Sequence, residues 1–192
     1  MRRLMRRVGP CLLQPDRRSS PYQALVGAIA HQQLTGAAAR TILSRLYALD
    51  GGKSCPAPET LLALPVEALR GAGFSAAKVL ALRDIAARAL DGSLPPRRIL
   101  QRWDDQRIVD QLVQIRGVGR WTVQMLLIFT LGRPDVLPVD DYGVRNGFRI
   151  AYGLDRLPTP GELGEHGLRW APERSTAAWY LWRAVDLERA AG

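Results

Sequence analysis

The chain of 192 residues contains few of the residue types that bind metals. It has two cysteines, Cys11 and Cys55, and two histidines, His31 and His166. A cysteine-ligated iron–sulfur cluster or a four-thiolate zinc site would need four cysteines, and the histidines do not form a metal-ligand spacing. We therefore expect two inert thiols, no structural metal and no cofactor.

Lysine and long apolar runs are scarce as well. Lys53 and Lys78 are the only lysines among 27 basic residues, so few amines could act as a Schiff-base nucleophile. No apolar run reaches the roughly 18 residues of a spanning helix, which excludes a membrane protein. The apolar run Cys11-Leu12-Leu13 is too short for the core of a signal peptide. A cytoplasmic protein is expected.

Charge, by contrast, is strongly of one sign. The formal net charge is +9 and the sequence pI is near 10.5. A polyanionic partner is indicated, nucleic acid first and an anionic membrane second. A soluble protein that is merely basic remains the alternative at this point.

Apolar residues recur at helical spacing along nearly the whole chain, and no strand ladder is visible. Thr35, Ser75 and Asp104 are expected as N-caps, and the apolar faces of the first two capped helices are expected to include Leu49 and Leu90. The fold class is predicted to be all-α, with about ten helices by this pattern. Helices are predicted over about 21–30, 36–50, 59–63, 66–70, 76–90, a short segment after 96, 105–115, 121–131, 141–152 and 173–188.

The sharpest break in the chain is Gly117-Val118-Gly119, between two predicted helices. Its glycines permit positive φ and a close backbone approach. The following helix presents free N–H groups and the positive end of its dipole, a site suited to a DNA phosphate. Arg116 and Arg120 flank the turn and add positive charge. Taken alone, the motif could equally be a tight connection between helices.

A second signal follows about twenty residues later, where Asp140-Asp141 begins a predicted helix within the segment Pro138–Arg145. The order of helix, Gly-Val-Gly, helix, Gly/Pro loop and aspartate resembles the helix-hairpin-helix (HhH-GPD) DNA glycosylase superfamily. The branch it resembles is DNA-3-methyladenine glycosylase II, the AlkA type. Three other segments support the resemblance, which runs from about Pro21 to Arg183: residues 28–35 (AIAHQQLT), residues 69–78, and Arg174-Ser175 followed by Trp182.

The resemblance implies a two-lobed helical architecture with a DNA- and base-binding cleft between the lobes. The whole chain, 1–192, would form one glycosylase unit. One lobe would centre on about 30–130 and include the hairpin at 107–131, and the other would combine the N-terminal segment with about 135–192. Bacterial members of this type carry an N-terminal β-rich subdomain for which this chain has no room, so it resembles a compact version.

The resemblance also assigns a catalytic carboxylate. Asp141 aligns with the family's aspartate at a helix N-terminus, where the dipole favours the ionised form. Such an anion stabilises an oxocarbenium-like sugar while the base departs and can orient the attacking water. Other branches of the superfamily would align Asp140 instead. For either residue, the purely structural alternative is a helix N-cap.

Aromatic residues are implied for the base pocket. The expected pocket residues are Trp121, Met125 and Trp182. Trp182 matches the tryptophan that lines the family's base pocket, and Met125, four residues after Trp121, shares its helix face. Electron-rich rings suit the cationic N3- and N7-alkylated purines. Trp121 lies where the superfamily's glycosylase-lyases carry a catalytic lysine, so a monofunctional, water-using enzyme is implied. The remaining tryptophans, Trp103, Trp170 and Trp179, are expected to serve packing.

The implied DNA contacts lie at two turns. Gln32 and Gln33 match the segment that fills the gap left by a flipped base, with Gln33 as the wedge; an ordinary interhelical turn is the structural alternative. The implied contact residues of the hairpin are Arg116, Gly117, Val118, Gly119, Arg120 and Thr122.

The resulting prediction is a monofunctional DNA glycosylase that hydrolyses the N-glycosidic bond of alkylated bases of the 3-methyladenine and 7-methylguanine type, in base excision repair. Its expected partner is double-stranded DNA with damaged bases, with no membrane contact. A monomer associated with the bacterial nucleoid is expected. A monovalent cation on the hairpin carbonyls is left open. The alternatives are a non-enzymatic helix-hairpin-helix DNA-binding protein and a glycosylase for other damaged bases.

Overall fold

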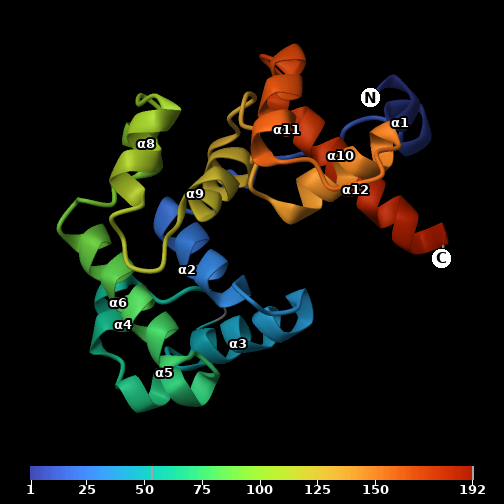
Figure 1. Cartoon of the computed structure of the whole chain (residues 1–192). Coiled ribbons are helices and arrows are strands. Elements are labelled where there is room, and N and C mark those ends of the chain that lie inside the picture. The colour runs from blue at the N-terminus through green and yellow to red at the C-terminus, as the bar shows by residue number, and fades with distance from the viewer. Residues whose placement is uncertain (53, 192) are drawn as a thin grey trace. The chain divides into compact units, whose positions relative to one another are not determined.

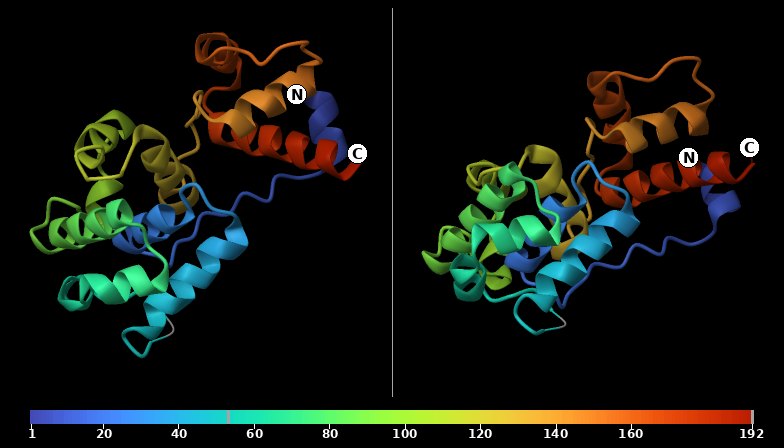
Figure 2. Two further views of the ribbon diagram at one scale, coloured as in Figure 1. Left: turned by 60° about the horizontal axis from the view of Figure 1, so that its bottom comes forward. Right: turned by 90° about the horizontal axis from the view of Figure 1, so that it is seen from below.

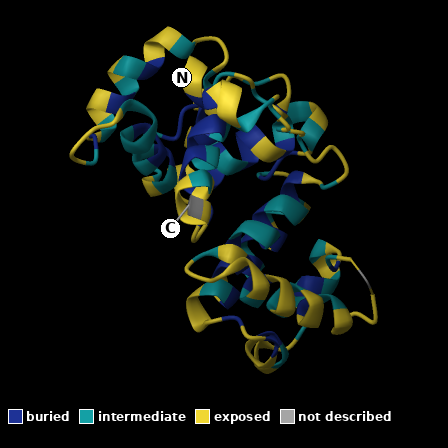
Figure 3. Ribbon diagram, turned by 90° about the vertical axis from the view of Figure 1, so that its right-hand side faces the viewer, coloured by how far each residue is buried: buried dark blue, intermediate teal, exposed yellow. Residues whose placement is uncertain are grey.

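The computed structural model describes residues 1–52 and 54–191. These residues form helices and contain no strand, which confirms the all-α fold class (Figure 1). The chain divides into two compact units, which we call the terminal unit (Met1–Pro15 with Leu127–Gly192) and the central unit (Asp16–Leu126). In each unit the helices turn their buried residues inward and their exposed residues outward (Figure 3). No described helix is long and apolar enough to cross a membrane.

The central unit packs its helices around α2, α6 and the hairpin. Helix α2 contacts α3, α6 and α9, and α4 lies against α6. Thr35, Ser75 and Asp104 each accept a backbone N–H three residues ahead, as predicted for N-caps. The helices are α2 (Pro21–His31), α3 (Gly36–Ala48), α4 (Pro58–Ala63), α5 (Val66–Ala72), α6 (Ala76–Leu90), α7 (Arg97–Leu100), α8 (Asp105–Leu112) and α9 (Arg120–Leu126).

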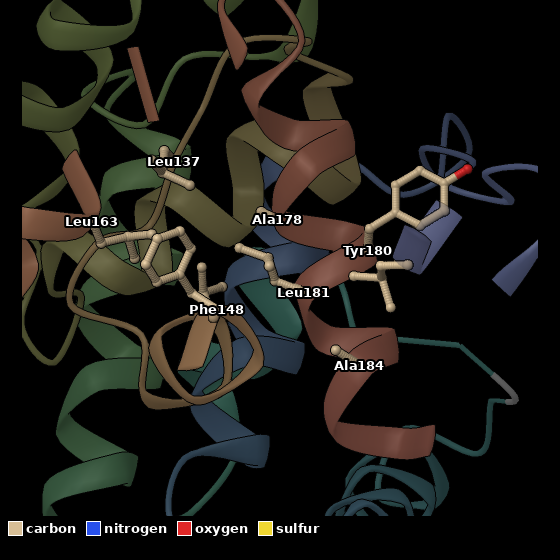
Figure 4. Packing of buried hydrophobic residues seen from close by; sticks show 9 residues of the cluster. Leu137, Phe148, Leu163, Ala178, Tyr180, Leu181 and Ala184 are labelled. Carbon is tan, nitrogen blue, oxygen red and sulfur yellow. The ribbon is translucent and has the colours of Figure 1, made fainter. Parts of the chain in front are cut away.

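The terminal unit has its core between α10 and α12, and α1 packs on α12. Figure 4 shows this core, in which Phe148 of α10 lies beside Leu181 of α12. The other buried members are Leu4, Leu137, Val144, Leu163, Ala178, Tyr180 and Ala184. The elements are α1 (Arg2–Val8), the π-helix η1 (Leu127–Leu131), α10 (Tyr142–Tyr152), α11 (Pro160–Gly167), the 3₁₀-helix η2 (Leu168–Trp170) and α12 (Arg174–Ala191).

The close packing of α10 on α12 depends on a glycine. A Cβ atom placed on Gly147 would overlap the backbone carbonyl of Leu181. Backbone atoms cannot move aside as a flexible side chain can, so a side chain here would push the two helices apart. Gly147 therefore sets the distance between the helices that carry Asp141 and Trp182.

Gly147→Ala is expected to lower the free energy of unfolding by about 1–3 kcal/mol, because it overpacks this contact. The measurement is urea unfolding followed by circular dichroism. Gly27→Ala is the matched control: Gly27 also lies inside a helix, and nothing stands within 4 Å of a Cβ at that position. The control is expected to leave stability unchanged or raise it by about 0.4–1 kcal/mol. Equal stability of the two variants would contradict the close approach.

Several elements differ from the prediction. Leu49 and Leu90 are 38% and 47% exposed, because Leu49 is the C-cap after α3 and Leu90 is the last residue of α6, both beyond the packed face. The single helix predicted over 121–131 is α-helical only to Leu126 and continues as a π-helix, which apolar spacing over five residues cannot distinguish from an α turn. Helices α1 and α11 were not predicted at all.

Three of the five tryptophans do pack as expected. Trp170 lies edge-on to Phe148 and His166 in an aromatic group of the terminal unit, where burial lowers the pKa of His166. Trp103 and Trp179 are half-buried, each beneath an arginine guanidinium at 4.1 and 5.5 Å from the ring centre. Their role is to extend packing outward beneath long side chains.

Candidate active site and DNA-contact turns

Asp141 directly precedes α10 and is its N-cap. One carboxylate oxygen, Oδ1, accepts the backbone N–H of Val144 at 2.7 Å and the indole N–H of Trp182 at 3.0 Å. The residue is half-buried. The helix dipole and the two donors all favour a fixed, ionised carboxylate.

Trp182 reaches this carboxylate from α12, and neighbouring residues hold it there. Phe129 of η1 lies against its ring, with centroids 5.6 Å apart and planes inclined by 31°. A Cβ on Gly143 would come within 3.0 Å of both the Asp141 oxygen and the indole. A larger residue at 143 would therefore separate the aspartate from its tryptophan.

The start of α12 is fixed by a bidentate ion pair between Arg174 and Asp135. The Arg174 guanidinium donates to both oxygens of Asp135, at 2.6 and 2.8 Å, and lowers the pKa of that carboxyl group. Ser175 is buried and bonds to the carbonyl of Arg133 and the N–H of Val136. These contacts anchor the helix two turns before Trp182.

The two adjacent aspartates differ in setting. Asp140 is exposed, and its side chain forms no hydrogen bond or ion pair with another described residue. Asp141 alone combines the N-cap position with the indole contact. The geometry therefore favours Asp141 as the reactive carboxylate, and its catalytic role stays a prediction.

The other predicted pocket residues lie on α9 in the central unit. Trp121 is 43% exposed and Met125 is half-buried. Their part in the base pocket stays a prediction. Phe129, which touches Trp182, was missed by sequence reasoning. Its spacing of four from Met125 and eight from Trp121 along the predicted helix was a usable signal.

The hairpin turn between α8 and α9 is built on Gly117. Its φ of +75° lies in the left-handed region, and a Cβ there would come within 3.0 Å of the Ala81 side chain. Nothing stands within 4 Å of a Cβ built on Gly119, so this side of the turn is open. Arg116 and Arg120 are exposed. The turn thus presents backbone and cations outward, as phosphate binding requires.

Two residues assigned to DNA contact turn their side chains inward instead. Val118 and Thr122 are 4% and 3% exposed. Their side chains hold the turn against the central unit, so only their backbone groups could face a phosphate. The spacing of the motif could not distinguish a backbone contact from a side-chain contact.

Two side chains of helix α6 form hydrogen bonds with the backbone of the hairpin. Asp84 accepts the backbone N–H of Arg116 at 2.7 Å and pairs with Arg88 at 3.2 Å. Arg88 in turn donates to the carbonyl of Gln114 at 3.0 Å. Sequence reasoning missed this pair, whose spacing of four on one helix face predicts an ion pair but not what it holds.

The Gln32-Gln33 turn is joined to the hairpin. The side-chain amide of Gln32 donates to the carbonyl of Gly117 at 2.9 Å and lies 3.5 Å from the Thr122 hydroxyl. Gln32 therefore joins the two turns. Gln33 is exposed and has a φ of +58°, the one positive φ of a non-glycine residue in the described part of the chain. That strained conformation marks Gln33 as held by its surroundings.

Lys78 helps to hold the Gln32-Gln33 turn in place. Its ammonium donates to the carbonyls of Ala30 and Gln32 at 3.1 and 2.7 Å, where α2 ends and the turn begins. The partial burial of this amine lowers its pKa. Lys78 is thus a positioning residue for the turn.

Lys78→Met is expected to lower the free energy of unfolding by about 1–3 kcal/mol, because two carbonyls lose a charged donor. It is also expected to weaken the 2-aminopurine fluorescence rise that reports base flipping. Arg83→Met is the matched control, since Arg83 lies on the same helix and donates to the carbonyls of Leu62 and Leu64, away from the turn. It should lose stability and keep the fluorescence signal. A normal signal in Lys78→Met would refute the positioning role.

A model of the HhH-GPD superfamily of base excision DNA repair proteins matches residues 26–173. The chain belongs to this superfamily. Within it, DNA-3-methyladenine glycosylase 1 of Schizosaccharomyces pombe is 39% identical over 189 residues, which cover 97% of this chain and 82% of the relative.

Two solved structures of the superfamily extend this similarity to the fold. The S. pombe 3-methyladenine DNA glycosylase in complex with abasic DNA has a TM-score of 0.86 and 39% identity, covering 95% of this chain and 89% of that one. A Bacillus halodurans DNA-3-methyladenine glycosidase has a TM-score of 0.83 and 35% identity, covering 92% and 81%. The predicted resemblance to 3-methyladenine glycosylases is confirmed.

Proposed function

We propose that this protein is a monofunctional DNA glycosylase that removes alkylated bases of the 3-methyladenine and 7-methylguanine type. The observation that carries the proposal is the Asp141 carboxylate, held at the start of α10 by the indole N–H of Trp182. The proposal is supported by relatives of this chain that are named for action on 3-methyladenine.

In the proposed reaction, the bond between the sugar C1′ and the base nitrogen breaks heterolytically. Its electron pair leaves with the base, which neutralises a base carrying the positive charge of alkylation. The Asp141 carboxylate stabilises the cationic sugar that remains. A water oxygen then bonds to C1′, and its proton passes to the carboxylate and on to solvent. The products are a free base and an abasic site.

A reaction that uses water also fits the position of Lys78, the lysine in the described part of the chain. Lys78 donates to two main-chain carbonyls in the central unit. An amine engaged in this way is a poor nucleophile for Schiff-base formation. Lys53 lies outside the described residues. The proposed enzyme therefore leaves the sugar–phosphate backbone intact.

Double-stranded DNA is the proposed partner, bound through the backbone and arginines of the hairpin turn. A carboxylate, a water molecule and an aromatic pocket are sufficient for the proposed chemistry, so no metal or redox cofactor takes part. We propose that the protein acts as a monomer on chromosomal DNA in the bacterial cytoplasm. A monovalent cation on the hairpin carbonyls is compatible with this role.

The test is base release from DNA treated with a methylating agent. Free 3-methyladenine and 7-methylguanine are expected by chromatography, together with abasic sites that alkali cleaves. Borohydride is not expected to trap a covalent complex, and EDTA should leave the rate unchanged. Binding without base release would instead show a non-enzymatic DNA-binding protein, and release of other damaged bases alone would correct the substrate class.

A further inference from the structure

Helix α1 is a cluster of arginines fixed to the terminal unit by buried Leu4, with Met1 and Val8 packed against the same core. Leu4 is 7% exposed and belongs to the core beside α12, whereas Arg2, Arg3, Arg6 and Arg7 are all exposed. Figure 2 shows from two sides that α1 lies beside the C-terminal part of α12. The arginines are therefore held on a docked helix rather than on an unfolded tail.

The guanidinium groups of these four arginines form no hydrogen bond or ion pair with another described residue. The neighbouring acid Glu188 is already paired with Arg149 at 3.4 Å. A surface hollow beside α1 is lined by Arg3, Arg7, Tyr152, Gly153, Leu187 and Glu188. The surface is thus strongly positive and leaves its phosphate-binding groups unused.

The charge pattern of α1 is unfavourable for the helix on its own. Arg2 and Arg6, like Arg3 and Arg7, are four residues apart on one face, where like charges repel. The first turn contains arginines and no acidic residue, opposite to the preference of the helix dipole. A polyanion bound along the helix would remove both penalties.

We propose that α1 is a second contact surface for duplex DNA, bound to backbone phosphates away from the damaged base. Helix α10 separates this surface from the carboxylate, since Asp141 caps its first turn and Tyr152 at its last turn lines the hollow beside α1. Its 11 residues span about 16 Å at 1.5 Å per residue. That length corresponds to about five base pairs of duplex at 3.4 Å each.

DNA suits this surface better than a lipid membrane does. A helix that lies in a membrane interface inserts an apolar face. The apolar residue Leu4 of α1 is instead buried in the protein core, and Met5, 41% exposed, is the one exposed apolar side chain of the helix. The planar guanidinium group can also donate two parallel hydrogen bonds to the oxygens of one phosphate, a bidentate contact.

The proposal rests on the proposed glycosylase function, and the test separates the two. The variant R2Q/R3Q/R6Q/R7Q of the full chain is compared with R2K/R3K/R6K/R7K, which keeps the charge. Dissociation constants for a 30-base-pair duplex with one central abasic-site analogue are measured between 50 and 200 mM salt. Each lost phosphate contact lowers the salt slope by about 0.9, so the glutamine variant is expected to lose about 2–4 units of slope. The lysine variant should keep it.

Truncated duplexes locate the contact. Duplexes cut to about three base pairs on one side or the other of the abasic analogue are shorter than the expected reach of about five. On one of them, the glutamine variant and the wild type should bind equally. Base release at saturating enzyme should be unchanged, because α1 does not touch the reacting atoms. If the glutamine variant unfolds on thermal melting, the double variants R2Q/R3Q and R6Q/R7Q carry the test.

Two outcomes would overturn the proposal, and a third would refute the proposed glycosylase function alone. An unchanged salt slope in the glutamine variant, while the wild type releases base, removes α1 from the DNA contact. A loss of binding to phosphatidylserine vesicles with an unchanged DNA slope makes the surface a membrane contact. A wild type that binds DNA and releases no base refutes the proposed glycosylase function, while a reduced slope in the variant would still support the DNA contact at α1.

Discussion

Asp141→Asn is expected to reduce single-turnover release of 7-methylguanine by about 10²–10³-fold, the effect of removing one strong electrostatic stabiliser from an active site. The substitution keeps the local structure. The amide oxygen of asparagine can still accept the N–H groups of Val144 and Trp182, and asparagine caps helices as well as aspartate does. What disappears is the negative charge that faces the cationic sugar. DNA binding is expected to persist or tighten, because a carboxylate near the phosphates is gone.

The matched control is Asp140→Asn, which removes the same charge one residue earlier at an exposed position. It is expected to retain near-wild-type rates. Asp141→Ala adds the loss of the cap and should also lower the free energy of unfolding by about 1 kcal/mol. An inactive Asp140→Asn beside an active Asp141→Asn would place the catalytic carboxylate one residue earlier in the chain.

Local patterns predicted most of the helices and the order of the motifs. Thr35, Ser75 and Asp104 cap the helices that they were expected to cap, since a cap depends on a few neighbouring residues. Helix α11 could have been found in the same way. Thr159 and Glu162 form a capping box around Pro160, a signal readable from the sequence alone. Helix α1 offered a short signal as well, because Met1, Leu4, Met5 and Val8 recur at helical spacing between the arginines. Its formation also depends on Leu4 docking into a core built elsewhere.

Site residues that belong to one short motif could be predicted from the sequence. Contacts between side chains from distant segments could not. Asp141 was readable as a residue at a helix start, and the resemblance supplied Trp182. The hydrogen bond between them joins residues 41 apart and depends on the packing of α10 on α12. The same applies to Lys78 and Gln32, whose partners lie 46 and 85 residues away. Periodicity shows which face of a helix is apolar, but not which polar groups that face will meet.

Trp182→Ala is expected to slow release of cationic methylpurines by about 1–3 kcal/mol in transition-state free energy, the value of one lost base–aromatic contact. The loss should be smaller on hypoxanthine, because a neutral base gains no cation–π attraction from the indole. Trp182 has a second role, however, since its N–H donates to Asp141. Trp182→Phe keeps an aromatic ring and removes that donor. It should preserve the preference for charged bases while lowering the rate on all lesions.

The assay is single-turnover base release from oligonucleotides that carry each lesion, with folding checked by thermal melting. Trp179→Ala is the control, because Trp179 lies on the same helix beneath Arg183 and is expected to affect stability alone. Trp121→Ala tests the predicted pocket position on α9 in the same assay. Equal losses on charged and neutral lesions in Trp182→Ala would remove the cation–π argument and leave the hydrogen bond to Asp141 as the function of this tryptophan. Full activity of folded Trp121→Ala and Trp182→Ala proteins would mean that other side chains line the base pocket.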